Sequence, residues 1–318
     1  MDGPKSTRPT VVLVPITVLV PDDHGMAVLS ELDGVRPVRF ERGRPMPPEA
    51  GDAEVLIPGF LAGKDAPRVL AQLPKLRLVQ LLSAGAETWI DRLPDGVMLA
   101  NCRGAHGGST AEWAVSALLS IYRHMRGFDH AQGERRWDHH RTDTLQGKRV
   151  LVVGAGDLGV QLRRRLEAFD TTVTLVGTTA RDDIRGVDEL PELLGDHDAV
   201  VLMVPVTAKT IGMVDADFLS RMPDGAILVN AARGVVVDTD ALLTELGTRR
   251  IRAALDVTDP EPLPAGHPLW SAPNVLINPH RGGASTAFAP RVGRLVRAQL
   301  ARYAKGEPLI NVVAGPAR

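Results

Sequence analysis

The stretch KRVLVVGAGDLGVQLRRRLEAF, residues 148–169, decides the fold of this chain. An apolar run leads directly into Gly154, Gly156 and Gly159, and a helix-compatible stretch follows. In this G-x-G-x-x-G spacing the first glycine permits a tight turn, the second lets the backbone approach a pyrophosphate, and the third lets the helix pack on the strand. The helix N-terminus then offers N–H groups and a positive dipole to phosphates. The pattern predicts a dinucleotide-binding strand–turn–helix; the alternative is a glycine-rich turn without a ligand.

On both sides of this unit, short apolar runs alternate with helix-compatible stretches. Before it the runs are VVLVPITVLV, VRPVRF, DAEVLIPG, LRLVQLLSAG and VMLAN, and after it they are VTLVG, DAVVLMVP, GAILVNAARG, IRAALDV and NVLINPH. Such alternation indicates α/β architecture with parallel sheets. The run at 11–21 contains Pro15 and is followed by a turn without a small-residue cleavage site, so it predicts the first buried strand rather than a signal peptide. The first ten residues are interpreted as a loose tail.

The composition limits the kinds of partner that we expect. The 318 residues are 44% hydrophobic, enough for two domains of ordinary size. The 37 Lys and Arg nearly balance the 38 Asp and Glu, so we expect neither nucleic acid nor a membrane as a partner. No metal-ligand spacing occurs, and the single cysteine, Cys102, is interpreted as a packed thiol of a cytoplasmic protein. We predict a small-molecule ligand and no metal.

Three further stretches carry residues suited to chemistry. Arg233 in GAILVNAARGVVVDTDAL follows an apolar strand, where α/β sheets bind ligands, and its planar guanidinium suits a carboxylate. Glu261 in LDVTDPEPLP lies between two prolines, which fix the direction of its carboxylate. His280 in NVLINPHRGGAS ends another apolar strand. Each has a structural alternative: a cap or surface ion pair for the arginine, a solvated acid for the glutamate, and a packing role for the histidine.

Together, RG-x-x-VD, LDV-x-x-PEP and NPH-x-GG after a glycine fingerprint closely resemble the D-isomer-specific 2-hydroxyacid dehydrogenase family. LDVTDPEPLP followed by HPL is most similar to its glyoxylate/hydroxypyruvate reductases. The resemblance implies hydride transfer between a nicotinamide cofactor and a 2-oxo acid, with His280 as the general acid in reduction and the base in oxidation. It implies that Glu261 holds the imidazole and favours imidazolium. Arg233 would bind the substrate carboxylate and polarise the carbonyl beside it.

The same resemblance implies the remaining site residues. Backbone N–H groups of Ala84 and Gly85, in LLSAGAE, would bind the substrate carboxylate. Asp256 would hold the nicotinamide carboxamide, although an acid that caps the strand end explains this residue nearly as well. The predicted cofactor residues are Gly154, Gly156, Asp157, Leu158, Gly159, Gly177, Thr178, Thr179, Arg181, Pro205, Ala231, Ala232, Asp256, Gly282 and Gly283.

The resemblance also implies the architecture: an α/β fold of two doubly wound parallel-sheet domains with a cleft between them. A flavodoxin-like substrate domain would comprise residues 1–101, completed by 286–318, and a Rossmann dinucleotide-binding domain would comprise 102–285. The stretch STAEWAVSALLSIYRHMRGF predicts a long helix that starts with a capping box of Ser109 and Glu112. Its apolar residues extend around most of the helix, which favours a homodimer interface over a helix between domains.

Close relatives within this family do other chemistry. Formate dehydrogenases carry glutamine where this chain has Glu261, and phosphite dehydrogenases carry lysine where it has Ala84, so both activities are disfavoured. A dinucleotide-sensing corepressor of the same fold, with little turnover, keeps the triad and stays open, although the chain lacks long disordered extensions. Trp137 lies in a polar connector, residues 130–148, from which a tryptophan of some relatives reaches the neighbouring subunit's pocket.

The stretch VTLVGTTAR, residues 173–181, bears on the choice of cofactor. In NAD-binding units an acid about twenty residues past the fingerprint ends the second strand and accepts hydrogen bonds from the ribose hydroxyls. By register that position is Gly177, which leaves room for a 2′-phosphate. Thr178 and Thr179 offer hydroxyl donors to that phosphate, and Arg181 offers positive charge. We therefore predict NADP(H) over NAD(H); the alternative is a surface turn with NAD still bound.

Overall fold

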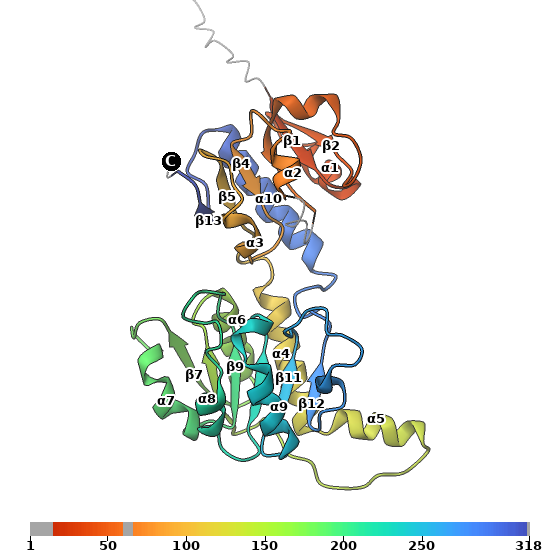
Figure 1. Ribbon diagram of the computed structural model, residues 1–318, viewed down its shortest axis with the longest axis vertical. Helices are drawn as coiled ribbons and strands as arrows, with labels where there is room; N and C mark the ends of the chain where they lie inside the picture. Colours follow the sequence, from red (N-terminus) through yellow and green to blue (C-terminus); the bar gives the residue numbers. More distant parts are fainter. Residues whose placement is uncertain (1–14, 60–65, 317–318) are drawn as a thin grey trace, which may run out of the picture. The chain divides into compact units, whose positions relative to one another are not determined.

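The computed structural model describes residues 15–59 and 66–316, which form two compact units. One unit holds the described residues up to Cys102 together with those from Pro290 onward, and the other holds Arg103–Ala289. The predicted substrate domain ends at residue 101 and resumes at residue 286. Both units are α/β (Figure 1). The predicted loose tail and the beginning of the predicted first strand lie outside the described residues.

The first unit contains a six-stranded sheet in the order β13-β5-β4-β3-β1-β2. Strands β2, β1, β3, β4 and β5 are mutually parallel in the flavodoxin-like order, and the unpredicted β13 joins β5 antiparallel. The strands are β1 Ile16–Val20, β2 Val35–Arg39, β3 Ala53–Leu56, β4 Leu78–Gln80, β5 Met98–Ala100 and β13 Val312–Ala314; the helices are α1 Asp23–Leu29, α2 Ala66–Leu70, α3 Glu87–Ile90 and α10 Phe288–Ala304, which begins just before the division.

The second unit contains a seven-stranded sheet in the order β12-β11-β10-β9-β6-β7-β8, with all strands parallel. This is the doubly wound dinucleotide-binding order with one added edge strand. The strands are β6 Arg149–Val153, β7 Thr172–Gly177, β8 Ile184–Gly186, β9 Ala199–Leu202, β10 Ile227–Asn230, β11 Arg252–Leu255 and β12 Val275–Ile277; the helices are α4 Gly107–Tyr122, α5 Met125–Gly133, α6 Asp157–Glu167, α7 Leu190–Leu193, α8 Ala216–Ser220 and α9 Thr239–Gly247.

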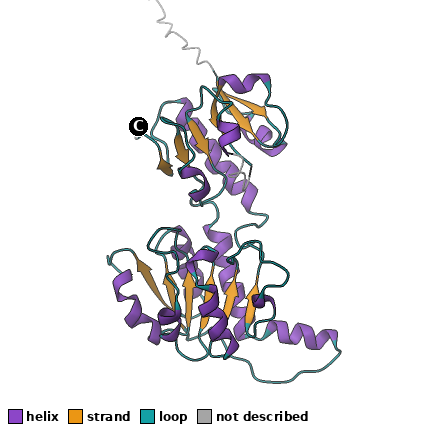
Figure 2. Cartoon of the chain, viewed as in Figure 1, coloured by secondary structure: helices purple, strands orange, loops and turns teal. Residues whose placement is uncertain are grey.

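Continuous apolar runs suit this sheet because both of its faces are covered (Figure 2). Along β6, Leu151 and Val153 join a core that contains the buried side chains of α7, α8 and α9. The alternate residues Val150 and Val152 join a second core with α4 and α6. Side chains of a strand alternate between faces, so one strand anchors helices on both sides and places the Gly154 turn at its carboxyl end.

The long helix predicted from Ser109 differs from the structure. Helix α4 begins two residues earlier, its N-cap His106 makes no side-chain cap hydrogen bond, and Ser109 Oγ instead lies 2.7 Å from Ser285 Oγ. The predicted capping box is therefore wrong, because a tertiary partner takes up the serine hydroxyl. The helix also ends at Tyr122, and His124 adopts a left-handed φ of 52° before α5 begins.

Three further observations concern membrane spans, metal ligands and the single cysteine. No helix in the described part of the chain is long and apolar enough to cross a membrane. Within residues 15–59 and 66–316, no group of three or more His, Cys, Asp and Glu side chains could hold a metal ion. Cys102 is buried, and this burial raises the pKa of its thiol to about 12 although Gln80 donates a hydrogen bond to the sulfur.

Candidate active site

The glycine turn after β6 has the geometry of a phosphate cradle. Gly154 has a φ of 123°, and a Cβ at this position would lie 2.3 Å from the carbonyl oxygen of Met203. A Cβ at Gly159 would lie 1.9 Å from the carbonyl oxygen of Gly154, so α6 can pack this closely only with glycine there. At Gly156, the N-cap of α6, a Cβ would meet no atom within 4 Å. The open position lies at the helix N-terminus, so the turn fits the pyrophosphate of a dinucleotide.

The two residues between these glycines contribute differently. The Asp157 carboxylate lies beside Gly107 of α4, since a Cβ on that glycine would be 2.1 Å from Asp157 Oδ2. This oxygen is buried and has no hydrogen-bond partner among the described residues. Leu158 is half-buried and packs on the core shared by α4 and α6. Their side chains therefore contact α4, and the backbone N–H groups remain the part suited to a phosphate.

The end of β7 brings an arginine over the predicted ribose position. A Cβ at Gly177 would lie 3.2 Å from Arg181 Nη1, so the guanidinium folds back over the glycine. The intervening turn is closed by paired backbone hydrogen bonds between Arg181 and Ile184, at 3.0 and 2.8 Å. Thr178 and Thr179 lie on this turn and are exposed. Hydroxyl donors and a cation thus lie together where an NAD-binding unit usually has an acid.

A buried asparagine shapes the turn that carries Arg233. Asn230, the last residue of β10, accepts a hydrogen bond from the N–H of Ala232 at 3.0 Å and donates one to the carbonyl oxygen of Arg233 at 2.9 Å. Arg233 Nη1 donates to the carbonyl oxygen of Ala232 at 2.8 Å, and Ala231 is buried. These bonds fix the backbone and part of the guanidinium at the carboxyl end of the strand, where α/β sheets bind ligands.

Asp256 organises the loop that carries His280. It directly follows β11, is 4% exposed, and its Oδ1 accepts hydrogen bonds from Asn278 Nδ2 and from the N–H groups of Arg281 and Gly282. The backbone contact continues because the N–H of His280 donates to the carbonyl oxygen of Asp256 at 2.7 Å. The turn-capping interpretation of Asp256 thus describes its observed contacts, and its predicted contact with the cofactor stays a prediction.

The predicted acid–base pair is in direct contact. His280 Nδ1 lies 2.6 Å from Glu261 Oε1, and the two side chains are 35% and 40% exposed. His280 has a left-handed φ of 52°, which a non-glycine residue adopts only where surrounding contacts impose it. Here those contacts are the backbone bond to Asp256 and the bond to Glu261. The histidine is therefore oriented both from its main chain and from its side chain.

The remaining predicted residues lie in two places. Pro205 follows β9, and its carbonyl oxygen accepts a hydrogen bond from Thr210. In the first unit, Ala84 and Gly85 lie in the loop after β4, where Asn101 Nδ2 donates to the carbonyl oxygen of Ala84 and Ser83 Oγ to that of Gly85, each at 2.7 Å. These bonds use the carbonyl oxygens, whereas the predicted substrate contact uses the N–H groups.

The parallel sheet brings most of these residues to one edge. The glycine turn, Arg181, Arg233, Asp256 and His280 all follow the carboxyl ends of strands in the second unit. Asn230 and Asn278, which hold this edge in place, were not predicted from the sequence. Their position directly before Ala-Ala-Arg and Pro-His was visible, but their bonding partners depend on the fold.

Comparisons with known proteins agree with this geometry. A family model described as D-isomer specific 2-hydroxyacid dehydrogenase, NAD binding domain, matches residues 115–282. A glyoxylate reductase of Thermofilum pendens is 31% identical over 265 residues, which cover 78% of this chain and 78% of that protein. A D-3-phosphoglycerate dehydrogenase of Archaeoglobus fulgidus is 31% identical over 229 residues, 70% of this chain but only 44% of that protein.

A solved structure shares the fold over almost its whole length. It is a D-isomer specific 2-hydroxyacid dehydrogenase from Xanthobacter autotrophicus in complex with NADPH and MES, with a TM-score of 0.81, 28% identity, and coverage of 95% of this chain and 98% of that chain. The family match, the relatives and the doubly wound sheets lead to one conclusion. This chain belongs to the D-isomer specific 2-hydroxyacid dehydrogenases, a family of NAD(P)-dependent oxidoreductases.

Proposed function

We propose that this enzyme reduces small 2-oxo acids to D-2-hydroxy acids with NADPH, as a reductase of the glyoxylate/hydroxypyruvate type. The observation that carries the proposal is the 2.6 Å contact between His280 Nδ1 and Glu261 Oε1 at the carboxyl edge of a dinucleotide-binding sheet. The similarity to a glyoxylate reductase supports this substrate class. In this assignment the first unit binds substrate and the second binds the cofactor.

The chemistry assigns one task to each side chain. When bound, the reduced cofactor supplies a hydride to the carbonyl carbon of the substrate. His280 uses Nδ1 toward Glu261, so its Nε2 delivers the proton to the carbonyl oxygen. The Glu261 carboxylate orients the ring and stabilises the imidazolium before proton transfer. Arg233 binds the substrate carboxylate and polarises the carbonyl.

Two main-chain groups and one acid complete the assignment. The N–H groups of Ala84 and Gly85 bind the substrate carboxylate, because hydrogen bonds to their carbonyls fix this loop while leaving its N–H groups for a ligand. Asp256 Oδ1 is bonded to the loop after β12, so its second oxygen is the one that would accept from the nicotinamide amide.

A substrate panel with two variants tests the activity. Wild-type protein should oxidise NADPH in the presence of glyoxylate, hydroxypyruvate or a bulkier 2-oxo acid. His280→Ala should lose turnover while it keeps its affinity for NADPH, since the ring acts on the substrate and not on the cofactor. Full turnover by this variant would remove His280 from its role. Cofactor binding by the wild type without turnover on any 2-oxo acid would favour a dinucleotide-sensing protein instead.

The proposed preference for NADPH rests on the turn after β7. The guanidinium of Arg181 folds over Gly177, and no acid occupies the strand end. Arg181→Ala should lower kcat/KM for NADPH about ten-fold or more and leave that for NADH nearly unchanged, because only NADPH carries the charged 2′-phosphate. Arg185→Ala, in the neighbouring strand, removes a charge that Glu189 already neutralises and is the matched control. A wild-type preference for NADH would contradict the assignment.

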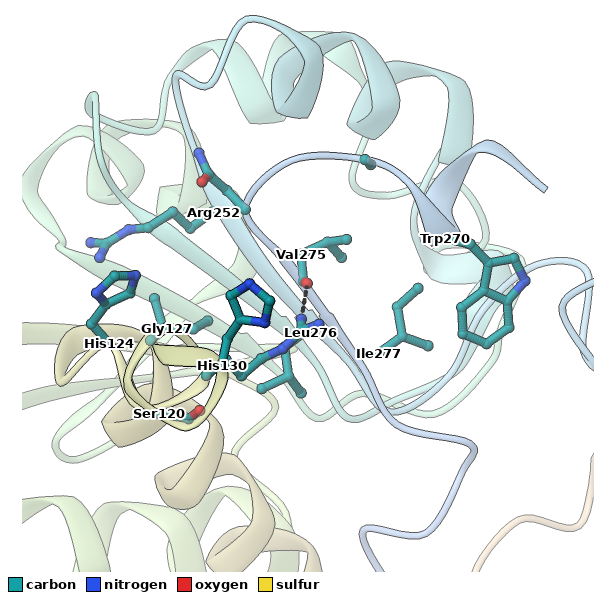
Figure 3. A pocket seen from close by; sticks show the side chains of 13 residues that line it. Ser120, His124, Gly127, His130, Arg252, Trp270, Val275, Leu276 and Ile277 are labelled. Atoms are coloured by element: carbon teal, nitrogen blue, oxygen red, sulfur yellow. Dashed lines mark hydrogen bonds between the residues drawn. The ribbon is translucent and has the colours of Figure 1, made fainter. Parts of the chain in front are cut away.

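We also propose a homodimer whose contact involves α4, α5 and the groove between them and β12. Residues of α4, α5 and β12, among them Ser120, Gly127 and Val275, line this groove (Figure 3). Its volume is about 810 Å³, and β12 is the edge strand of the sheet. Trp270 at the groove is 52% exposed, and Met125 and Trp137 in the same unit are 56% and 93% exposed. Exposed apolar side chains of this size are typical of interfaces.

Light scattering tests this arrangement directly. The wild type should have twice the mass of one 34.1 kDa chain, and Trp270→Glu should shift the population toward the monomer because it buries a charge in the contact. A monomeric wild type would overturn the proposal.

A further inference from the structure

The turn after β7 carries two acids directly behind Arg181, and helix α6 binds one of them. Asp182 and Asp183 form the tip of this turn, which the paired backbone bonds of Arg181 and Ile184 close. Asp183 Oδ2 lies 2.5 Å from Nη1 of Arg163 in α6. The Arg181 guanidinium, in contrast, has no ion pair or hydrogen bond with any residue in the described ranges.

This unpaired guanidinium lies beside the glycine turn. A Cβ on Gly177 would lie 3.2 Å from Arg181 Nη1 and 3.5 Å from the Cβ of Ala155, a residue of the fingerprint. Arg181 is therefore close both to the end of β7 and to the predicted pyrophosphate cradle. Helix α6 begins at this cradle and also carries Arg163. One helix thus contacts both turns to which the proposed cofactor would present a phosphate.

The ion pair between α6 and the turn is not needed to hold the turn together. The side chains of Arg163 and Asp183 are 26% and 68% exposed, and ion pairs so accessible to solvent stabilise a fold only weakly. The turn is closed by its own backbone bonds. What the pair determines is the position of the Asp183 charge. Two residues span at most about 7 Å, so an unpaired Asp183 carboxylate is within reach of the Arg181 guanidinium.

We propose that Arg163 is a positioning residue for cofactor specificity, which holds the Asp183 carboxylate away from Arg181 and so leaves that guanidinium for the 2′-phosphate of NADPH. The inference rests on the proposed preference for NADPH. An arginine that pairs with a neighbouring carboxylate no longer offers its fork of donors to a phosphate. An unpaired carboxylate beside the site also repels the phosphate. NADH has no 2′-phosphate, so Arg163 should affect the reaction with NADPH alone.

Variants that remove a charge from either side of the pair test the inference. Arg163→Ala should lower the ratio of kcat/KM for NADPH to that for NADH about three- to five-fold, mainly through KM, the factor expected for a solvent-accessible charge pair. Asp183→Asn should not lower this ratio, and the double variant should recover the wild-type ratio because no acid then competes for Arg181. A pair that only held the turn in place would give equal losses from either side and no recovery.

Two matched controls separate pairing from net charge. Arg164→Ala removes the same charge from the next position of α6, where the arginine has no ion pair within the described part of the chain, and should leave the ratio unchanged. Asp182→Asn should change the ratio by the same factor with and without Arg163, whereas Asp183→Asn should raise it more strongly when Arg163 is absent.

The outcomes separate this inference from the proposed cofactor preference. An unchanged ratio in Arg163→Ala, or a recovery by Asp182→Asn as complete as that by Asp183→Asn, would overturn the role of Arg163 while the preference for NADPH stands. A wild type that prefers NADH would overturn that preference, and this inference with it.

Discussion

The second and third glycines of the fingerprint, Gly156 and Gly159, allow cofactor binding and packing to be separated. A Cβ added at Gly156 would meet no atom within 4 Å, whereas one added at Gly159 would lie 1.9 Å from the backbone oxygen of Gly154. Gly156 also has a φ of −85° and a ψ of −164°, an extended conformation open to alanine. Gly156→Ala and Gly159→Ala therefore add the same methyl group to an open position and to one blocked by backbone.

The magnitudes follow from these distances. At Gly159 the contact is at least 1.5 Å shorter than an ordinary 3.4 Å contact, and the neighbour is backbone that cannot rotate away. Overpacking of this kind costs about 1–3 kcal/mol or more. At Gly156 the reduced freedom of the unfolded chain stabilises by about 0.4–1 kcal/mol, and the poorer N-cap offsets part of this. We expect a clearly lower thermal midpoint for Gly159→Ala and little change for Gly156→Ala.

Cofactor affinity should show a different pattern. If the pyrophosphate approaches the backbone at Gly156, the Cβ of the alanine in Gly156→Ala occupies the same space. The Kd for NADPH should then rise about ten-fold or more, equivalent to about 1.4 kcal/mol. The two assays are thermal unfolding without cofactor and fluorescence quenching by NADPH. A Gly156→Ala protein of normal stability that binds NADPH as tightly as the wild type would refute the assignment of this turn to the pyrophosphate.

Three other predictions test single residues. Asp256→Ala should lower turnover and should also lower the free energy of unfolding by about 2–4 kcal/mol, because three donors lose one buried acceptor. Normal thermal stability of this variant would contradict the proposed role of Asp256 in holding the loop. Burial lowers the pKa of His197 below the value of about 6.5 that an unperturbed histidine has. Below about pH 6.5 the histidine of the unfolded chain binds a proton that the native His197 does not bind. The free energy of unfolding should therefore fall on acidification by up to about 1.4 kcal/mol per pH unit, and it should fall less steeply in His197→Gln. Cys102, whose thiol pKa burial raises to about 12, should react with a thiol reagent at about pH 8 only after unfolding, and fast labelling of the native protein would disprove this.

Local patterns predicted most of the fold because six of the seven strands of the second sheet are short apolar runs, and a turn begins where each run ends. The glycine fingerprint then fixed the order of the sheet through its known strand–turn–helix context. The edge strands β8 and β13 have only three residues each and were not predicted. Strand β8, with the sequence IRG, has no apolar run, and the VVA of β13 is too short to distinguish a strand from a loop. The break at His124 was missed for a similar reason, since neither glycine nor proline marks it.

The chemical groups of the site could be predicted from the sequence, but the residues that hold those groups in place could not. Glu261 and His280 are 19 positions apart, and their pairing was expected only from the family resemblance. The hydroxyl of Ser109 suggested a helix cap, yet it contacts Ser285, far away in the sequence. Short polar side chains have several possible partners, and only the folded chain determines which one is within reach.

Two buried polar residues at the carboxyl ends of adjacent strands each hold the backbone that carries a proposed catalytic side chain. Asn230 ends β10 and bonds the backbone of Ala232 and Arg233, while Asp256 follows β11 and bonds the loop around His280. Strands β10 and β11 are paired in register, so Asn230 opposes Leu255, next to Asp256. A buried polar group with several hydrogen bonds keeps its neighbours in one arrangement, because any other arrangement breaks those bonds. The proposed carboxylate-binding and proton-transfer groups are therefore positioned by the sheet itself, through side chains that need not touch the substrate.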